Sequence, residues 1–214
     1  MDNNYIITIG REYGSGGLDI GMKVAEMLGI KCYDKELINL AANTQGISKK
    51  VLTELEEHRG NFLKDPTANI FHSSRKNNLP AFGAFGRSMN DRVFMAESSA
   101  IRKLADEESC VIIGRCADVL LRNKENTFTI FIQAPKEDRI KRIAERTEET
   151  LEEAEKEMKK VDKTRSSYYE YYTDSKWGDR KGYDLMIDSS LLGIEGTAKQ
   201  IVEIVQEKYI QQTS

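Results

Sequence analysis

The chain has 214 residues, 39% of them hydrophobic, and carries 32 Lys and Arg against 35 Asp and Glu, a formal net charge of -3. A chain of this length can bury one substantial core without disulfides or structural metals, so we expect one domain over residues 1–214. The balanced charge gives no general attraction to nucleic acid or to a membrane surface, so we expect neither as a partner and any anion site must be local.

The three cysteines, Cys32, Cys110 and Cys116, are odd in number and show no CxxC spacing. We interpret them as free thiols in a reducing compartment. The N-terminal segment lacks a basic region followed by a long apolar run, and no stretch approaches the ~18 apolar residues of a membrane helix. These features predict a cytoplasmic protein.

Five short apolar runs rich in β-branched residues predict strands, at residues 5–9, 30–33, 110–113, 128–132 and 183–187. Helical periodicity lies between and after them, and is clearest over 18–28 and 194–209. Continuous apolar strands that alternate with amphipathic helices predict a parallel sheet covered on both faces. The sequence therefore predicts an α/β fold of three layers.

Two long segments carry no strand pattern. Residues 35–108 are interpreted as a helical insertion with a polar loop, whose periodicity is interrupted at Pro66, Pro80, Gly83 and Gly86. Residues 136–172 are highly charged and mostly helical, and we interpret them as a lid. The sequence leaves open whether the insertion makes a homo-oligomer.

The first predicted strand runs directly into GREYGSGGLDIG, so glycines crowd a strand-to-helix turn. Glycines let backbone N–H groups turn toward an anion, and a helix N-terminus adds the positive end of its dipole. We therefore predict a site for the phosphates of ATP, formed by Tyr13, Gly14, Ser15, Gly16, Gly17 and Leu18. The alternative is a glycine turn that only packs the helix against the strand.

A Walker loop has the pattern GxxxxGK followed by Ser or Thr. When Gly14 and Gly16 are aligned with its last glycines, Gly17 takes the place of the lysine and Leu18 that of the Mg²⁺-binding hydroxyl. Arg11 is our candidate for the missing cation, since a guanidinium can bind phosphate through two hydrogen bonds. The alternative is that Arg11 points away and pairs with a carboxylate such as Glu12 or Asp19.

Phosphoryl transfer depends on cations around the transferred group, so arginines are the other candidates. Arg115 follows the third predicted strand, at the end where open α/β sheets bind ligands. Arg139, Arg142 and Arg146 share a helix surface after the fourth strand, and surface pairing with glutamates is the alternative for Arg139 and Arg146. Neither histidine has a partner at metal-ligand spacing, so we expect no metal site made by protein alone.

Several segments occur in the order seen in one known family: IGREYGSGG, CYDKELI, IIGRCADVLL, APKEDRIKR and DKTRSSYYEYYTDSKWGDRKGYDLMIDSS. Over nearly its whole length the chain resembles the cytidylate kinase-like family. The resemblance implies a P-loop NTPase-like fold with a five-stranded parallel sheet, an insertion that binds the acceptor monophosphate, and a mobile lid. It also implies ATP with Mg²⁺, and small nucleotide substrates.

The family's motifs assign roles to particular residues. Asp162 and Arg165 match the end of the lid motif RDxxDxxR, whose first two positions are Met158 and Lys159 here. The resemblance implies that Arg142 and Arg165 close on the transferring phosphoryl group.

For the acceptor, the resemblance implies contacts from Arg115 and from Asp34, where family members have an acceptor-binding aspartate. The following pattern SGxxYR is KELINL here, with Leu40 in place of the arginine, so the acceptor stays open between a CMP-like or dCMP-like monophosphate and a related small molecule. Asp118 is predicted either to bind Mg²⁺ through water, beside the acceptor, or to cap the following helix.

The tyrosines from 168 to 172, with Trp177 and Tyr183, are interpreted as packing of the lid against the core, with stacking on a base as the alternative. Together these observations predict an ATP-dependent kinase for a small acceptor. The alternative is a nucleotide-binding regulatory or interaction protein that has lost turnover.

Overall fold

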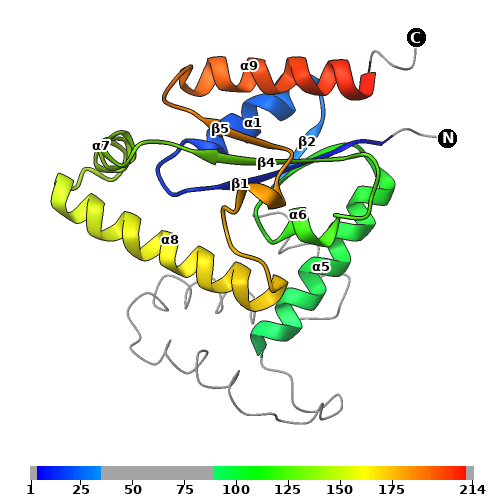
Figure 1. The fold of residues 1–214 in the computed structure, drawn as a ribbon, viewed down its shortest axis with the longest axis horizontal. Helices are drawn as coiled ribbons and strands as arrows, with labels where there is room; N and C mark the ends of the chain where they lie inside the picture. Colours follow the sequence, from blue (N-terminus) through cyan, green and yellow to red (C-terminus); the bar gives the residue numbers. More distant parts are fainter. Residues whose placement is uncertain (1–3, 35–88, 211–214) are drawn as a thin grey trace. The chain divides into compact units, whose positions relative to one another are not determined.

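The structure, a computed structural model, describes residues 4–34 and 89–210. In these residues five parallel strands form one sheet in the order β2-β3-β1-β4-β5 (Figure 1). The strands are β1 (Ile6–Arg11), β2 (Lys31–Tyr33), β3 (Cys110–Ile113), β4 (Thr127–Gln133) and β5 (Leu185–Asp188).

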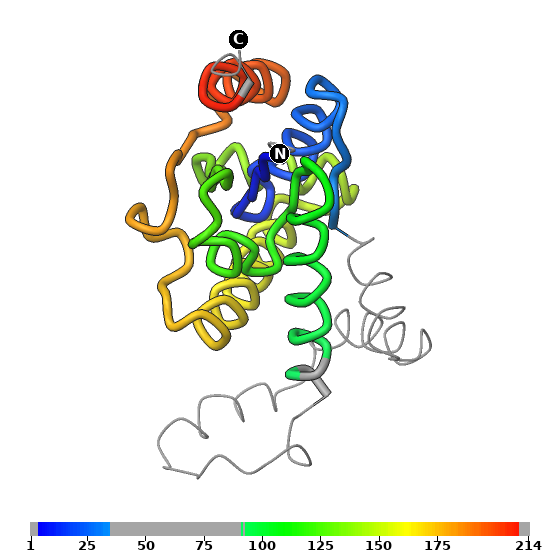
Figure 2. The backbone as a smooth tube through the Cα atoms, turned by 90° about the vertical axis from the view of Figure 1, so that its right-hand side faces the viewer, coloured from blue at the N-terminus to red at the C-terminus, as the bar shows by residue number. Residues whose placement is uncertain are grey.

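Helices cover the sheet on two faces, which completes three layers. The described helices are α1 (Gly17–Leu28), α5 (Met89–Glu107), α6 (Ala117–Leu120), α7 (Lys136–Thr147), α8 (Leu151–Thr173) and α9 (Gly193–Val205), with a 3₁₀ turn at Arg180–Gly182 and a π-helical turn at Gln206–Ile210. Figures 1 and 2 show α1 and α9 side by side on one face, and Figure 1 shows α6 and α8 on the other.

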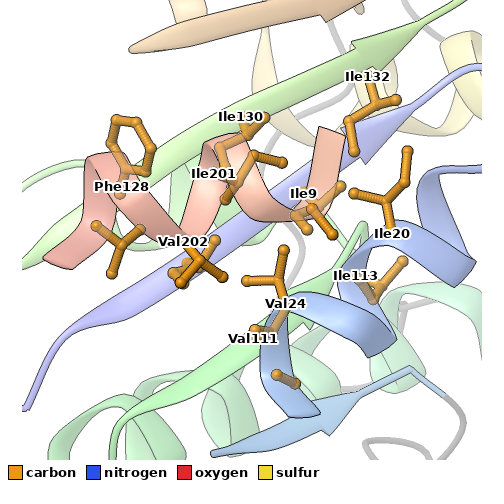
Figure 3. Close-up of a cluster of buried hydrophobic side chains, with 14 residues drawn as sticks. Ile9, Ile20, Val24, Val111, Ile113, Phe128, Ile130, Ile132, Ile201 and Val202 are labelled. Carbon is orange, nitrogen blue, oxygen red and sulfur yellow. The ribbon is translucent and has the colours of Figure 1, made fainter. Parts of the chain in front are cut away.

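The main core lies between the sheet and the α1–α9 layer (Figure 3). Alternate strand residues face this layer, since successive side chains of a strand point to opposite faces. The strands contribute Ile7, Ile9, Val111, Ile113, Phe128, Ile130 and Ile132, and the helices contribute Ile20, Val24, Ala25, Ala198, Ile201, Val202 and Val205. The residues between them, such as Ile6 and Ile112, are also fully buried, so the strands are apolar on both faces.

The register of the central strands sets the position of the site. β1 pairs with β3 and β4, so that Ile9 is opposite Ile113 on one side and Ile130 on the other. The parallel strands therefore end at the same edge, and the segments that follow β1, β3 and β4 emerge there. Ligands of open α/β sheets bind at this carboxyl edge.

The predicted strands are confirmed within about two residues at each end, a margin usual for element boundaries. Residues 1–35 and 101–214 form one compact unit. Of the second unit, residues 36–100, the structure describes only the start of α5, so most of the predicted insertion, Leu40 included, lies outside the described residues.

The three cysteines are free thiols, with Cys110 and Cys116 buried and Cys32 half-buried. In the described part of the chain, no helix combines the length and apolar character needed to span a membrane.

Candidate phosphate-binding site

The glycine-rich turn connects β1 to α1 and has the backbone of an anion-binding loop. Gly14 and Gly16 have φ angles of 80° and 77°, on either side of Ser15. Left-handed residues in such alternation turn neighbouring N–H groups toward one concavity. Gly16 caps α1 without a side-chain hydrogen bond, so the N–H groups of the first helical turn remain available to an anion.

The same glycines also allow close packing. A Cβ at Gly14 would lie 2.7 Å from the Arg139 carbonyl oxygen and 2.9 Å from Ile143 Cδ1, and one at Gly16 would lie 3.2 Å from Ile194 Cγ1. Helices α7 and α9 therefore pack directly on the turn. Packing and an anion-binding conformation are thus both built into these glycines.

Arg11 occupies the space beside the position of the missing lysine. A Cβ at Gly17 would lie 2.5 Å from Arg11 Cβ, and a Cβ at Gly114 would overlap the Arg11 guanidinium. The Arg11 side chain thus passes Gly17 and extends across the end of β3, where side chains at 17 and 114 would block it. Glu12, one of the carboxylates considered as its partner, instead accepts hydrogen bonds from Arg139 and from Ala134 N–H.

The Arg11 side chain lies among other charges of the predicted site. Burial lowers its pKa to about 9, with Arg165 and Arg115 acting in the same direction and Asp34 in the opposite one. Burial also lowers the pKa of Arg165. Three guanidinium groups and one carboxylate that the sequence put forward as candidates therefore influence one another near the carboxyl edge of the sheet, and their excess positive charge favours an anionic ligand.

Arg115 lies in a backbone segment that residues with side chains normally avoid. Gly114, Arg115 and Cys116 have successive φ angles of 72°, 59° and 58°. For a residue other than glycine, this left-handed conformation costs roughly 1–2 kcal/mol. Such strain is concentrated at functional sites, and here it lies directly after β3.

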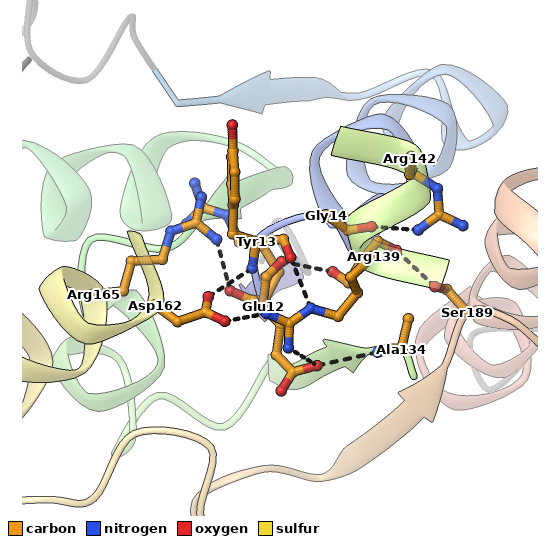
Figure 4. Close-up of polar contacts among 11 residues, drawn as sticks. Glu12, Tyr13, Gly14, Ala134, Arg139, Arg142, Asp162, Arg165 and Ser189 are labelled. Carbon is orange, nitrogen blue, oxygen red and sulfur yellow. Dashed lines mark hydrogen bonds and ion pairs between the residues drawn. The ribbon is translucent and has the colours of Figure 1, made fainter. Parts of the chain in front are cut away.

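The helices α7 and α8 are bound to the glycine turn through its main chain (Figure 4). Arg139, only 6% exposed, donates from Nε to the Tyr13 carbonyl at 2.8 Å and pairs with Glu12 and Asp162. Asp162 Oδ1 accepts the Tyr13 N–H at 2.8 Å. Arg139 therefore connects α7 and α8 to the glycine turn. It is not a surface arginine that pairs with neighbouring glutamates, which was the alternative considered from the sequence.

Two further arginines of these helices reach neighbouring carbonyls of the turn. Arg142 donates to the Gly14 carbonyl, and Arg165 donates to that of Arg11 at 3.0 Å. The Tyr13 ring lies under the guanidinium groups of Arg146 and Arg165, 5.1 and 5.5 Å from its centroid. The structure thus brings Arg142, Asp162 and Arg165 to the glycine turn by contacts to its backbone.

Asp118 lies in a buried hydrogen bond away from the turn. The residue is 8% exposed, its carboxylate accepts the Tyr169 hydroxyl at 2.5 Å, and burial raises its pKa. Asp118 lies in the first turn of helix α6, and its carboxylate also accepts hydrogen bonds from the backbone N–H groups of Asp118 and Val119, a contact of the capping kind. Tyr169 is itself buried, and Trp177 packs edge-on against Phe131, so these aromatic residues pack α8 and the following segment against the sheet.

The model of the cytidylate kinase-like family matches residues 6–191. The chain belongs to the cytidylate kinase-like family. A search of curated protein sequences found no match.

Solved structures resemble this family member over nearly its whole length. An uncharacterized protein from Eubacterium ventriosum is 28% identical with a TM-score of 0.70, and the match covers 96% of this chain and 100% of the other. The shikimate kinase from Bacteroides thetaiotaomicron is 13% identical with a TM-score of 0.53, covering 94% and 98%. The shikimate kinase from Acinetobacter baumannii is 14% identical with a TM-score of 0.50, covering 97% and 96%. These neighbours show that the fold is P-loop NTPase-like.

Family membership and fold support a nucleotide-binding, kinase-like protein. Within residues 4–34 and 89–210, no group of three His, Cys, Asp or Glu side chains is arranged to hold a metal ion.

Sequence reasoning did not assign functions to Glu12 or to Ser189, which donates to the Ser15 carbonyl. The signal that could have identified Glu12 is its charge, because a carboxylate inside an anion-binding loop needs a cationic partner to neutralise it.

Proposed function

We propose that this chain binds ATP on the turn from Tyr13 to Leu18 and transfers its γ-phosphoryl group to a small anionic acceptor. The acceptor is a nucleoside monophosphate of the CMP or dCMP type, or a related molecule. The observation that carries the proposal is the glycine turn, which leaves the N-terminus of α1 without a side-chain cap, beside a cluster of Arg11, Arg115 and Arg165. Phosphoryl transfer needs little beyond positioning and such positive charge.

The turn fits the triphosphate of ATP. Gly14 and Gly16 have the left-handed conformations that turn backbone N–H groups toward an anion, and the N-terminus of α1 favours negative charge. When bound, Mg²⁺ supplies neutralisation of charge on the β- and γ-phosphate oxygens. Leu18 offers the metal no oxygen, and the Ser15 hydroxyl donates to the Glu12 carbonyl at 2.9 Å. We therefore expect Mg²⁺ to enter with the nucleotide, held mainly by phosphate oxygens and water.

The arginines divide into two proposed groups. Arg11 replaces the Walker lysine, and Arg142 and Arg165, on the α7–α8 lid, stabilise the charge of the transferring group. A guanidinium has five N–H donors, so one bond to a carbonyl of the turn leaves donors for a phosphate. Arg115 and Asp34, after β3 and β2, orient the acceptor.

The proposed role of Asp162 is to hold this lid on the turn, since its carboxylate binds Tyr13 and Arg139. For Asp118, the buried bond to Tyr169 supports an indirect part in acceptor binding, through the position of α8.

A second candidate function is nucleotide binding without turnover. It is favoured by the loss of both the lysine and the hydroxyl of the Walker pattern, at Gly17 and Leu18. In that case the protein would regulate or bind a partner through its nucleotide-dependent conformation.

A coupled assay of ADP formation separates the two functions. Purified protein is given ATP, Mg²⁺ and one acceptor at a time from a panel of nucleoside monophosphates and related phosphorylated or carboxylated molecules. We expect acceptor-dependent ADP formation with at least one of them. ATP binding measured by calorimetry, combined with no turnover above the acceptor-free rate, would establish the binding function instead.

A further inference from the structure

Three successive carbonyl groups of the glycine turn are each held by a side chain from elsewhere in the fold. The Tyr13 carbonyl accepts from Arg139 Nε at 2.8 Å, and the Gly14 carbonyl accepts from Arg142 Nη1. The Ser15 carbonyl accepts from Ser189 Oγ at 2.6 Å. Figure 4 shows these donors arriving from α7 and from the segment that follows β5.

The direction of a carbonyl fixes the direction of the next N–H. In a trans peptide, the C=O of one residue and the N–H of the following residue point in opposite directions. The described residues contain no cis peptide bond. When the carbonyls of Tyr13, Gly14 and Ser15 are held against α7 and Ser189, the N–H groups of the next three residues must therefore point the other way.

These three N–H groups belong to Gly14, Ser15 and Gly16. The Ser15 N–H makes a long contact of 3.4 Å to the Glu12 carbonyl. The positive φ angles of Gly14 and Gly16, on either side of Ser15, are the values that turn successive N–H groups toward the same side. A row of N–H groups on one side, with the carbonyls secured on the other, is the arrangement that an anion requires.

We propose that Ser189 and Arg139 are positioning residues, which hold the glycine turn in its anion-binding form by fixing the carbonyls of Ser15 and Tyr13. The inference rests on the proposed function, because it explains how the same turn is preorganised for phosphate. Neither residue needs to touch the nucleotide. Arg142 completes the set through the Gly14 carbonyl.

Burial makes these hydrogen bonds difficult to replace. Ser15 and Ser189 are fully buried, so water cannot easily substitute for the lost hydroxyl. The charge of Arg139 is balanced by Glu12 and Asp162, and this explains the acidic residue inside the loop. Glu12 orients Arg139 and also accepts the Ala134 N–H at 3.2 Å.

Asp162 refines the limits of the predicted anion site. Its carboxylate accepts the Tyr13 N–H while Arg139 donates to the Tyr13 carbonyl, so Tyr13 is held on both sides. Its N–H is then occupied by a carboxylate of the protein. In this arrangement the row of N–H groups offered to phosphate begins at Gly14.

The test compares two adjacent serines, using inorganic tripolyphosphate as the probe and the full chain as the protein. Ser189→Ala removes the buried donor, whereas Ser190→Ala removes a hydroxyl that donates to Asp188 at 2.7 Å at the surface. By calorimetry we expect binding to weaken about tenfold in S189A, as for loss of one buried hydrogen bond, and to stay unchanged in S190A.

A spectroscopic measurement separates positioning from a general loss of stability. In wild-type protein the amide ¹H–¹⁵N signals of Gly14 and Gly16 should shift on adding tripolyphosphate. In S189A the Gly16 signal should already differ without ligand and should respond less. The thermal midpoint of each variant shows whether folding is affected.

Arg139→Lys is the second variant, because lysine keeps the charge but carries all its donors on one nitrogen and cannot reach the three partners that Arg139 binds through Nε, Nη1 and Nη2. Its control is Arg122→Lys, at an exposed arginine that contacts Ser175 at 3.4 Å. We expect weaker tripolyphosphate binding in R139K alone. This variant also decides the matter if S189A does not fold.

The outcomes distinguish the two claims. Binding by wild type with unchanged affinity in both S189A and R139K overturns the positioning inference and leaves the proposed function intact. No binding of either tripolyphosphate or ATP by the wild-type protein overturns both.

Discussion

Gly16 and Gly29 lie at the two ends of α1 and hold similar left-handed conformations, with φ angles of 77° and 67°. At Gly29 an added Cβ would meet nothing within 4 Å, and the residue ends the helix by donating its N–H to carbonyls of the last turn. At Gly16 the Cβ would lie 3.2 Å from Ile194 Cγ1 and 3.7 Å from Nη1 of Arg142, one of the arginines proposed to bind phosphate. The pair therefore separates the conformational role of a glycine from its role in binding.

We expect Gly16→Ala and Gly29→Ala to destabilise the fold by similar amounts, about 1 kcal/mol each, because alanine is strained in this conformation. Only Gly16→Ala should also weaken ATP binding, by at least tenfold. Chemical denaturation and ATP calorimetry on both variants measure the two effects. Unchanged ATP affinity in the Gly16 variant would place the nucleotide elsewhere.

Asp118 gives a prediction about pH. Its pKa is raised because its carboxyl group is buried, so the folded state binds a proton more tightly than the unfolded state. Between the two pKa values the native protein therefore holds more protons, and stability falls as pH rises through that window. Asp118→Asn keeps an oxygen that can accept the Tyr169 hydroxyl and removes this dependence.

We expect Asp118→Asn to be at least as stable as wild type at pH 7 and to lack the part of the stability loss that begins just above the ordinary carboxyl pKa. Urea unfolding from pH 4 to 7 measures the stability of each protein. The control variant is Asp106→Asn, at an exposed residue that forms a surface ion pair with Lys124 in the wild type. A larger stability loss at pH 7 than in the control would show that the charge itself stabilises the fold.

At the scale of elements, α7 and α8 form one unit with the glycine turn. Arg139 and Arg142 are three residues apart on α7, and Asp162 and Arg165 are three apart on α8, so each pair faces the turn from one side of its helix. All four bind the backbone of residues 11–14. Nucleotide binding at the turn should therefore change the stability of both helices.

Hydrogen exchange tests this coupling. We expect amide exchange in α7 and α8 to slow when a non-hydrolysable ATP analogue binds, because phosphate offsets the desolvation of their arginines. Helix α9 contributes Val205 and Ile201 to the core on the opposite layer, and its second half should be unaffected. Protection that changes at the turn alone would show that α7 and α8 are a fixed scaffold and do not act as a lid.

The sequence was sufficient for much of this arrangement and insufficient for the rest, for physical reasons. Apolar runs such as 110–113 predict buried strands, and parallel strands bring the residues that follow them to one edge, so Arg11, Asp34 and Arg115 could be grouped in advance. The path of the Arg11 side chain across Gly114 could not be predicted, because it depends on Gly17 and Gly114, which are distant from each other in the sequence.

The hydrogen-bond and ion-pair partners of Arg139 and Ser189 could not be predicted from the sequence either. Arg139 lies among glutamates on a charged helix, and nothing local distinguishes it from a surface residue, yet it is buried against Glu12 from a segment 127 residues earlier. Ser189 reaches Ser15 across 174 residues. Such contacts follow from the packing of the layers, and a periodic pattern carries no information about them.

At the scale of the whole molecule, charges from four separate segments converge on the place where a P-loop enzyme has its lysine. Arg11 is the last residue of β1, Asp34 follows β2, Arg115 follows β3, and Arg165 lies on α8. A Cβ at Gly17 would lie 2.5 Å from Arg11 Cβ, so a lysine at 17 and the present Arg11 cannot coexist. The central claim is therefore that Arg11 supplies the cation in place of the lysine.

The most direct test is the rate of acceptor-dependent ADP formation by Arg11→Ala, measured beside wild type and the surface variant Arg122→Ala. We predict that Arg11→Ala lowers turnover by ~10² or more, the effect of removing one preorganised electrostatic partner, while Arg122→Ala stays within a few-fold of wild type. Turnover at the wild-type level in a folded Arg11→Ala protein would contradict the account.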